Sequence, residues 1–202
     1  MAAPLVVGFD LDMTLIDSRP GIGAVYERLA SETGVAIDVD LVTSRLGPPV
    51  ESELAHWFPA DEVPALADRY RELYPELAVE AVGTMPGAHE ALAAVRALGG
   101  RTVLVTAKNA PAARRHLDHL GLELDAVHGR LWREGKAVAL RGERATAYVG
   151  DHVHDVEAAL AAGVTAVGVT TGPCSGVELQ RAGADVVLHS LLDLPELLES
   201  IG

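Results

Sequence analysis

Short apolar runs rich in β-branched residues recur along this chain, and they constrain its fold more than any other feature. Continuous apolar runs of this length are typical of parallel strands that are buried on both faces. The runs occupy residues 4–9, 101–106, 145–150, 165–170 and 184–189. We therefore predict five strands of a parallel sheet at these positions.

Segments rich in Ala and Leu lie between most of these runs, show helical spacing and end at glycine. They cover residues 87–100, 110–121 and 156–164. Strands that alternate with helices predict an α/β fold. The expected core is a doubly wound, Rossmann-like parallel sheet with helices on both faces.

The stretch from Ser18 to Gly83 breaks this rhythm because it holds no strand candidate of comparable strength. Turn-forming residues interrupt its amphipathic helical segments at Gly34, 47–49 and 58–64. Its leucines and aromatic residues recur at helical spacing, which indicates packing surfaces. We predict a small α-helical domain at residues 18–81, inserted into one core made of residues 1–17 and 82–202.

The chain is acidic, with 29 Asp and Glu against 16 Lys and Arg, and its formal net charge is -13. This balance disfavours binding to nucleic acid or to an anionic membrane surface. The first residues lack a basic segment, and acids interrupt their apolar run, so we expect no signal peptide and a cytoplasmic protein. Cys174 is the single cysteine, which excludes an intrachain disulfide.

Polar residues follow three of the predicted strands, at the sheet edge where ligands gather in open α/β folds. They are Asp10, Asp12 and Thr14 after the first strand, Thr106 after the second, and Asp151 and Asp155 after the third. Each Asp on its own could cap a helix. Four carboxylates at one edge repel each other unless a cation neutralises them, and an all-oxygen set suits Mg²⁺.

The same residues resemble the motifs of the haloacid dehalogenase superfamily. FDLDMTLIDS (9–18) is similar to the first motif, DxDxT, and VLVTAK (103–108) to the second. GK (135–136) resembles the third motif, and VGDHVHDVEAALAAG (149–163) resembles the fourth. The four matches occur in the family's order and span nearly the whole predicted core.

This resemblance implies a phosphatase mechanism. Asp10 would attack phosphorus and form an aspartyl-phosphate, and Asp12 would protonate the leaving group and later activate water. Thr106 and Lys136 would bind the phosphoryl oxygens. Lys108 is the alternative cation, since the third motif here lacks the proline that often follows its lysine.

The resemblance also implies the ligands of a Mg²⁺ ion. They would be Asp10, the backbone carbonyl of Asp12, Asp151, and Asp155 either directly or through water. His152 and His154 lie inside the fourth motif, but a full oxygen set leaves them no place as ligands.

The inserted helical segment corresponds to the cap of this superfamily, which closes over the sheet edge and contacts the substrate. RLGPPVESEL (45–54) and MPGAHEAL (85–92) look like parts of phosphoglycolate phosphatase-type members. The resemblance thus implies a small phosphorylated metabolite such as 2-phosphoglycolate, with Arg45 as a contact to its carboxylate. The oligomeric state stays open.

Three other functions remain open on the sequence. A sugar phosphomutase or another phosphotransferase would use the same Asp10 and Asp12 and return the phosphoryl group to a second hydroxyl. A dehalogenase would keep the nucleophile but would need neither Asp12 nor Asp151. A catalytically silent binding protein on this fold is disfavoured by the complete motifs.

Overall fold

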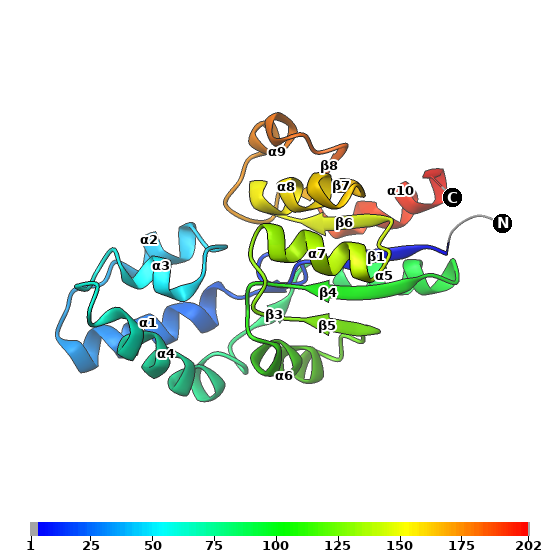
Figure 1. Ribbon diagram of the computed structural model, residues 1–202. Helices are drawn as coiled ribbons and strands as arrows, with labels where there is room; N and C mark the ends of the chain where they lie inside the picture. Colours follow the sequence, from blue (N-terminus) through cyan, green and yellow to red (C-terminus); the bar gives the residue numbers. More distant parts are fainter. Residues whose placement is uncertain (1–3, 202) are drawn as a thin grey trace.

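The computed structural model describes residues 4–201, and its main feature is a six-stranded parallel sheet (Figure 1). The strands lie in the order β5-β4-β1-β6-β7-β8. Their bounds are Val6–Phe9 (β1), Arg101–Val105 (β4), Ala126–His128 (β5), Ala147–Gly150 (β6), Thr165–Val169 (β7) and Val186–Leu188 (β8). All five predicted strands are present, and β5 is the one that the sequence analysis missed.

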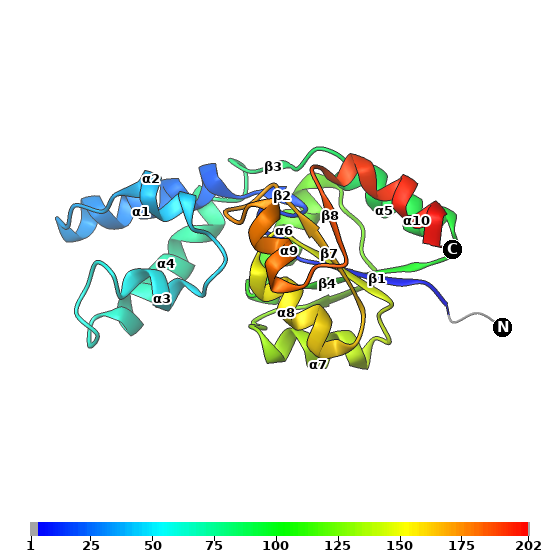
Figure 2. The same cartoon turned by 90° about the horizontal axis from the view of Figure 1, so that it is seen from above.

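Helices cover both faces of this sheet because successive strand residues point to opposite sides. Val7 packs into one hydrophobic cluster and its neighbour Val6 into another. The first cluster includes residues of α5 (Ala88–Ala97), α6 (Ala110–Leu120) and α10 (Leu194–Ile201). The second includes residues of α7 (Glu134–Gly142), α8 (Val153–Ala162) and α9 (Gly176–Ala182). Figure 2 shows α5 and α10 on one side of the sheet and α7 and α8 on the other, so the predicted α/β architecture is confirmed.

Four of the five helices between β1 and β4 form a separate body to one side of the sheet (Figures 1 and 2). They are α1 (Arg19–Thr33), α2 (Val39–Ser44), α3 (Val50–Leu54) and α4 (Val63–Leu77). They share their own hydrophobic cluster, which includes Val25, Leu29 and Leu54. The short antiparallel pair β2 (Ile16–Asp17) and β3 (Gly83–Thr84) stands where the chain enters and leaves this body.

The predicted breaks in the helical segment fall between its helices. Gly34 ends α1 in the left-handed conformation, with a φ of 72°, and its N–H donates to the carbonyl of Ala30. Residues 47–49 precede α3, and 58–64 include the start of α4. Within residues 4–201, no helix is long and apolar enough to cross a membrane.

Candidate active site

The sheet order places three polar strand ends side by side. β1 lies between β4 and β6, and the residues after these strands are Asp10, Thr106 and Asp151. The Asp10 N–H donates to the carbonyl of Val149 in β6 at 2.9 Å. The parallel register therefore brings together residues that are far apart in the sequence, at the edge where the sequence analysis expected a site.

Three carboxylates form a cluster at this edge. Asp10, Asp151 and Asp155 each offer an oxygen, and these oxygens all lie within 4.8 Å of one another. The exposed fractions of the three residues are 8%, 3% and 3%. Hard oxygen donors that converge in a buried place can hold a divalent cation, so the donor set fits a metal ion. The side chain of Asp12 is not part of this cluster.

Lys136 inserts its ammonium group among these acids. Its side chain is 3% exposed, and Nζ donates to Oδ1 of Asp10 at 2.9 Å and to Oδ1 of Asp155 at 2.6 Å. Burial lowers the pKa of Lys136, but the charges of Asp10 and Asp155 outweigh burial and raise it. The lysine is thus a buried cation that touches Asp10, while Lys108 lies against Asp12.

Burial and mutual repulsion raise the pKa of two of the acids. Burial is the larger cause for Asp10, and its pKa rises to about 7 although Lys136 opposes the shift. The pKa of Asp151 lies well above its usual value because of burial and then the charges of Asp155 and Asp10. A bound cation would reverse these shifts because it favours the ionised carboxylates.

Hydrogen bonds orient the cluster from both sides. The hydroxyl of Thr14, which is fully buried, donates to Oδ1 of Asp151 at 2.6 Å. The sequence analysis had not assigned Thr14 this contact. On the other side, Asp155 accepts hydrogen bonds from Tyr148 Oη at 3.2 Å and from the His152 N–H at 3.2 Å.

Asp12 belongs to a second polar network that reaches the helical body. Nζ of Lys108 lies 3.1 Å from Oδ1 of Asp12 and donates to the hydroxyl of Tyr74 in α4 at 2.7 Å. Tyr74 Oη also lies 2.9 Å from Nε2 of His116 in α6. Thr106 is 1% exposed, and its hydroxyl accepts from the Lys108 N–H at 3.2 Å.

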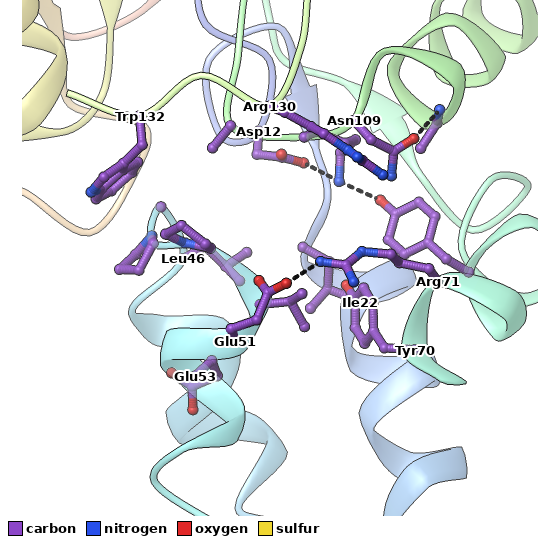
Figure 3. Close-up of a pocket in the computed structure, with 18 of the residues that line it drawn as sticks. Asp12, Ile22, Leu46, Glu51, Glu53, Tyr70, Arg71, Asn109, Arg130 and Trp132 are labelled. Atoms are coloured by element: carbon purple, nitrogen blue, oxygen red, sulfur yellow. Dashed lines mark hydrogen bonds and ion pairs between the residues drawn. The ribbon is translucent and has the colours of Figure 1, made fainter. Parts of the chain in front are cut away.

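A cavity of about 750 Å³ lies between these strand-end residues and the helical body. Figure 3 shows Asp12, Asn109, Arg130 and Trp132 on one wall, opposite Leu46, Glu51 and Arg71. Arg45 also lines the cavity, but Glu53 binds its guanidinium with hydrogen bonds of 2.8 and 2.7 Å. Its predicted contact to a substrate carboxylate stays a prediction.

Several cavity residues were not found from the sequence. Arg71 in α4 pairs with Glu51 in α3, and Trp132 and Arg130 come from the loop after β5. Charged and aromatic residues in a helical segment look like ordinary surface and packing residues. Among the cavity residues of the helical segment, the amphipathic sequence pattern singled out only Tyr70. Its helical spacing with the neighbouring leucines indicated a packing surface and not a substrate contact.

The histidines and the cysteine near the site have structural contacts. His152 caps α8 through its side chain, and His154 lies 2.9 Å from Glu157. Within the part of the chain that the structure describes, the metal-binding group contains neither histidine. Burial raises the pKa of the half-buried Cys174 thiol, which makes it a poor nucleophile.

Comparisons with known proteins agree with this geometry. The family model of haloacid dehalogenase-like hydrolases matches residues 7–169. Phosphoglycolate phosphatase from Caulobacter vibrioides is 30% identical, over 94% of this chain and 89% of its own length. Tyrosine-protein kinase PtkA from Mycobacterium tuberculosis is 28% identical, over 99% of this chain and 73% of its own length.

The fold also matches solved structures. A hydrolase of the haloacid dehalogenase-like family from Streptococcus pneumoniae superposes with a TM-score of 0.86 at 22% identity. The match covers 98% of this chain and 99% of that one. At this identity the likeness concerns the fold, and it extends over the helical body as well as the sheet.

Proposed function

The chain belongs to the haloacid dehalogenase-like hydrolase family, and from this premise we propose a Mg²⁺-dependent phosphatase that hydrolyses a small phosphomonoester through an aspartyl-phosphate at Asp10. Its class is phosphoric monoester hydrolase, as its family and its phosphatase relatives indicate. One observation supports the detailed proposal most: Asp10 ends the central strand within a buried set of two further carboxylates and one ammonium group.

Asp10 has the environment of a nucleophile. Lys136 binds its Oδ1, so Oδ2 is the oxygen that would attack phosphorus. A new bond from Oδ2 to phosphorus forms while the bond from phosphorus to the leaving oxygen breaks. Lys136 would offset the charge of the phosphoryl group, and the Thr106 hydroxyl, at the adjacent strand end, would donate to a phosphoryl oxygen.

Asp12 is the proposed general acid and base. It lies two residues after the nucleophile and lines the cavity, so it faces the space that a leaving group would occupy. In the first step it would give a proton to the leaving oxygen, and in the second it would take one from the water that attacks the aspartyl-phosphate. Lys108, 3.1 Å away, would stabilise the carboxylate form between these steps.

Mg²⁺ would be held by Asp10, the backbone carbonyl of Asp12 and Asp151, with Asp155 directly or through water. When bound, the ion supplies positive charge that balances the acids and the phosphoryl group. Thr14 would fix the orientation of Asp151 for this purpose. Asp155 also binds Lys136, so it would hold the lysine beside the nucleophile.

We further propose that residues 18–81 act as a cap over a core of residues 1–17 and 82–202. Helices of this segment form one wall of the cavity that Asp12 lines, and strand-end loops form the other (Figure 3). Such a cap would exclude water from the aspartyl-phosphate and contact the leaving group. The named phosphatase relatives favour 2-phosphoglycolate or a metabolite like it as the substrate.

A screen of phosphomonoesters tests this proposal. Activity is measured with Mg²⁺ and with EDTA, and the substrates are ranked by kcat/KM. The expected result is metal-dependent phosphate release that Asp12→Ala lowers by about 10²–10⁴-fold. The exposed Asp118 in α6 provides the control, and Asp118→Asn should keep full activity. Turnover that survives removal of the metal would refute the mechanism.

Phosphoryl transfer to another acceptor is the second candidate, since a tyrosine-protein kinase is among the relatives. The aspartyl-phosphate would then be attacked by a hydroxyl in place of water. The ratio of released phosphate to consumed ester distinguishes the two. A ratio of one indicates hydrolysis, and a lower ratio with a phosphorylated product indicates transfer.

A further inference from the structure

Arg130 has an unusual backbone conformation at the wall of the cavity. It follows β5 and the single residue Gly129, and its φ is 59°, in the left-handed region that few residues other than glycine adopt. A bulky residue in this conformation is strained, so the surrounding structure must impose it.

The loop that follows β4 imposes this conformation. The Arg130 N–H donates to the carbonyl of Lys108 at 2.9 Å, and the Leu131 N–H donates to the carbonyl of Thr106 at 3.0 Å. A Cβ at Gly129 would stand 2.7 Å from the Lys108 carbonyl oxygen and would collide with the backbone of Ala110. The two loops therefore touch through their backbones, which fixes Arg130 relative to the proposed phosphoryl site at Thr106.

The guanidinium of Arg130 differs from most cations around the cavity because it forms no ion pair; its charge acts on Glu51, which is paired with Arg71, only from beyond ion-pair distance. Glu53 binds Arg45, Glu51 and Asp68 bind Arg71, and Asp12 binds Lys108. No described residue forms a hydrogen bond or ion pair with the side chain of Arg130. Arg115, on the regular helix α6, likewise has none, but its backbone is not tied to the strand-end loops.

The position of Arg130 and its positive charge together indicate that it binds an anionic part of the substrate. Figure 3 shows the Arg130 side chain on the wall that carries Asp12, the proposed general acid. A leaving group that receives its proton from Asp12 lies beside this wall. The chain as a whole has a charge of -13, so an anionic group on the leaving group needs a local cation that is not already in an ion pair with a carboxylate.

We propose that Arg130 binds a second anionic group, a carboxylate or a phosphate, on the leaving group of the substrate. This inference rests on the proposed phosphatase function and narrows its substrates to phosphomonoesters that carry another negative charge. A guanidinium forms paired hydrogen bonds with either anion. The cavity of about 750 Å³ has room for leaving groups larger than glycolate.

Arg130 is better placed for this role than Arg45. Arg45 would have to leave Glu53, whose Oε1 also accepts a hydrogen bond from Trp57 Nε1 at 2.9 Å. Breaking the pair would leave that carboxylate without its cation in a half-buried position. Arg130 can bind an anion without the loss of an existing ion pair.

The test compares kcat/KM of Arg130→Asn and wild type on matched esters. Asparagine removes the charge and tolerates the left-handed conformation. The substrates are 2-phosphoglycolate and ethylene glycol bisphosphate, whose leaving groups carry a second anion, and 2-hydroxyethyl phosphate, whose leaving group is uncharged. A charge-assisted hydrogen bond is worth about 1.5–3 kcal/mol, so kcat/KM for a charged ester should fall about 10- to 150-fold. The value for 2-hydroxyethyl phosphate should change less than about threefold, and Arg130→Lys should restore part of the loss.

Control variants test whether the effect is specific to the position of Arg130. Arg144 shares the left-handed conformation, with a φ of 54°, but it does not line the cavity, so Arg144→Asn should not change the preference for charged esters. A larger loss for 2-phosphoglycolate than for the bisphosphate identifies carboxylate as the bound group, and the reverse identifies phosphate.

Equal losses of kcat/KM in Arg130→Asn on esters with charged and with uncharged leaving groups would overturn the inference. It would also be overturned if only Arg45→Asn lost the preference for charged leaving groups. These outcomes leave wild-type hydrolysis intact and so leave the proposed function standing. If wild type hydrolyses none of the esters with Mg²⁺, the proposed function fails, and the inference fails with it.

Discussion

At the scale of single residues, the site is a balance of buried charges around Asp10. Lys136 contributes one positive charge against three carboxylates, Asp10, Asp151 and Asp155, which leaves a surplus of negative charge. Burial first, and then the repulsion between the acids, raises the pKa of Asp10 and Asp151. The same surplus holds Lys136 in its ammonium form. A nucleophile in this setting depends on its neighbours, and a cation completes the charge balance.

The buried His116 gives the stability of the protein a specific dependence on pH. Burial, followed by the charge of Lys108, lowers its pKa from 6.5 to about 4. The unfolded chain therefore takes up a proton first as the pH falls, and stability is lost between pH 6.5 and 4. We expect His116→Gln to remove up to about 1.4 kcal/mol per pH unit of this dependence.

Urea unfolding at several pH values between 7 and 4.5 measures this effect. A glutamine amide can donate or accept a hydrogen bond, so the variant still offers a partner to the hydroxyl of Tyr74. His119, on the exposed side of the same helix, is the matched control, and His119→Gln should follow the wild-type profile. Parallel profiles for wild type and His116→Gln would contradict the account.

At the scale of elements, the helical body is joined to the sheet where α1 begins and α4 ends. Gly21 lies in the first turn of α1, and a Cβ there would stand 2.5 Å from the carbonyl oxygen of Ala78 and 2.9 Å from Val82 Cγ2. Only glycine permits this approach of the two backbones. This close contact between the start of α1 and the residue after α4 is called the crossing here, and it lies next to β2 and β3, which lead into and out of the body.

Gly21→Ala should therefore destabilise the protein although alanine is the better helix former. Because a backbone must move, we expect a loss of about 1–3 kcal/mol in the free energy of unfolding. Gly23, two positions further along α1 and facing α2 instead of Ala78, is the matched control. A Cβ there would first meet Val39 Cγ1 at 3.3 Å, so Gly23→Ala should change stability by less than about 1 kcal/mol. Equal stability of both variants would show that the crossing is not tight.

The strands illustrate what could be predicted from the sequence. β1 and β4 are buried on both faces, so their apolar runs are continuous and easy to recognise. β5 was missed because it has three residues, all half-buried, at the edge of the sheet. An edge strand of this kind depends on pairing with β4, which no local pattern encodes.

The residues of the site divide in the same way, into those that a local sequence pattern locates and those that depend on the folded chain. Asp10, Thr106 and Asp151 could be located because a parallel sheet brings its strand ends to one edge. The pairing of Arg45 with Glu53 and the unpaired side chain of Arg130 could not. Arg45 and Glu53 lie eight residues apart on different helical turns, so their pairing depends on how the segment between them folds. The state of Arg130 depends on which residues of the helical segment meet the loop after β5, and packing of the whole chain decides that.

At the scale of the whole molecule, the net charge of -13 and the buried acids should make folding sensitive to divalent cations. Mg²⁺ at about 100 times its Kd would add about 2.7 kcal/mol to the free energy of unfolding, which raises Tm by about 5–10 °C for a chain of this size. Thermal unfolding with and without MgCl₂, at an ionic strength matched with NaCl, measures the shift. Asp151→Asn should lose most of it, and an equal shift in that variant would assign the effect to the surface charge.

The central claim is that Asp10 carries the phosphoryl group during turnover. Rapid acid quenching of the enzyme with its best ester, followed by borohydride reduction, converts an aspartyl-phosphate to homoserine, which peptide mass spectrometry locates. The account predicts homoserine at position 10 in wild type and at no position in Asp10→Asn, which should also be inactive. Steady hydrolysis with an unmodified Asp10, or with the label at another residue, would contradict it.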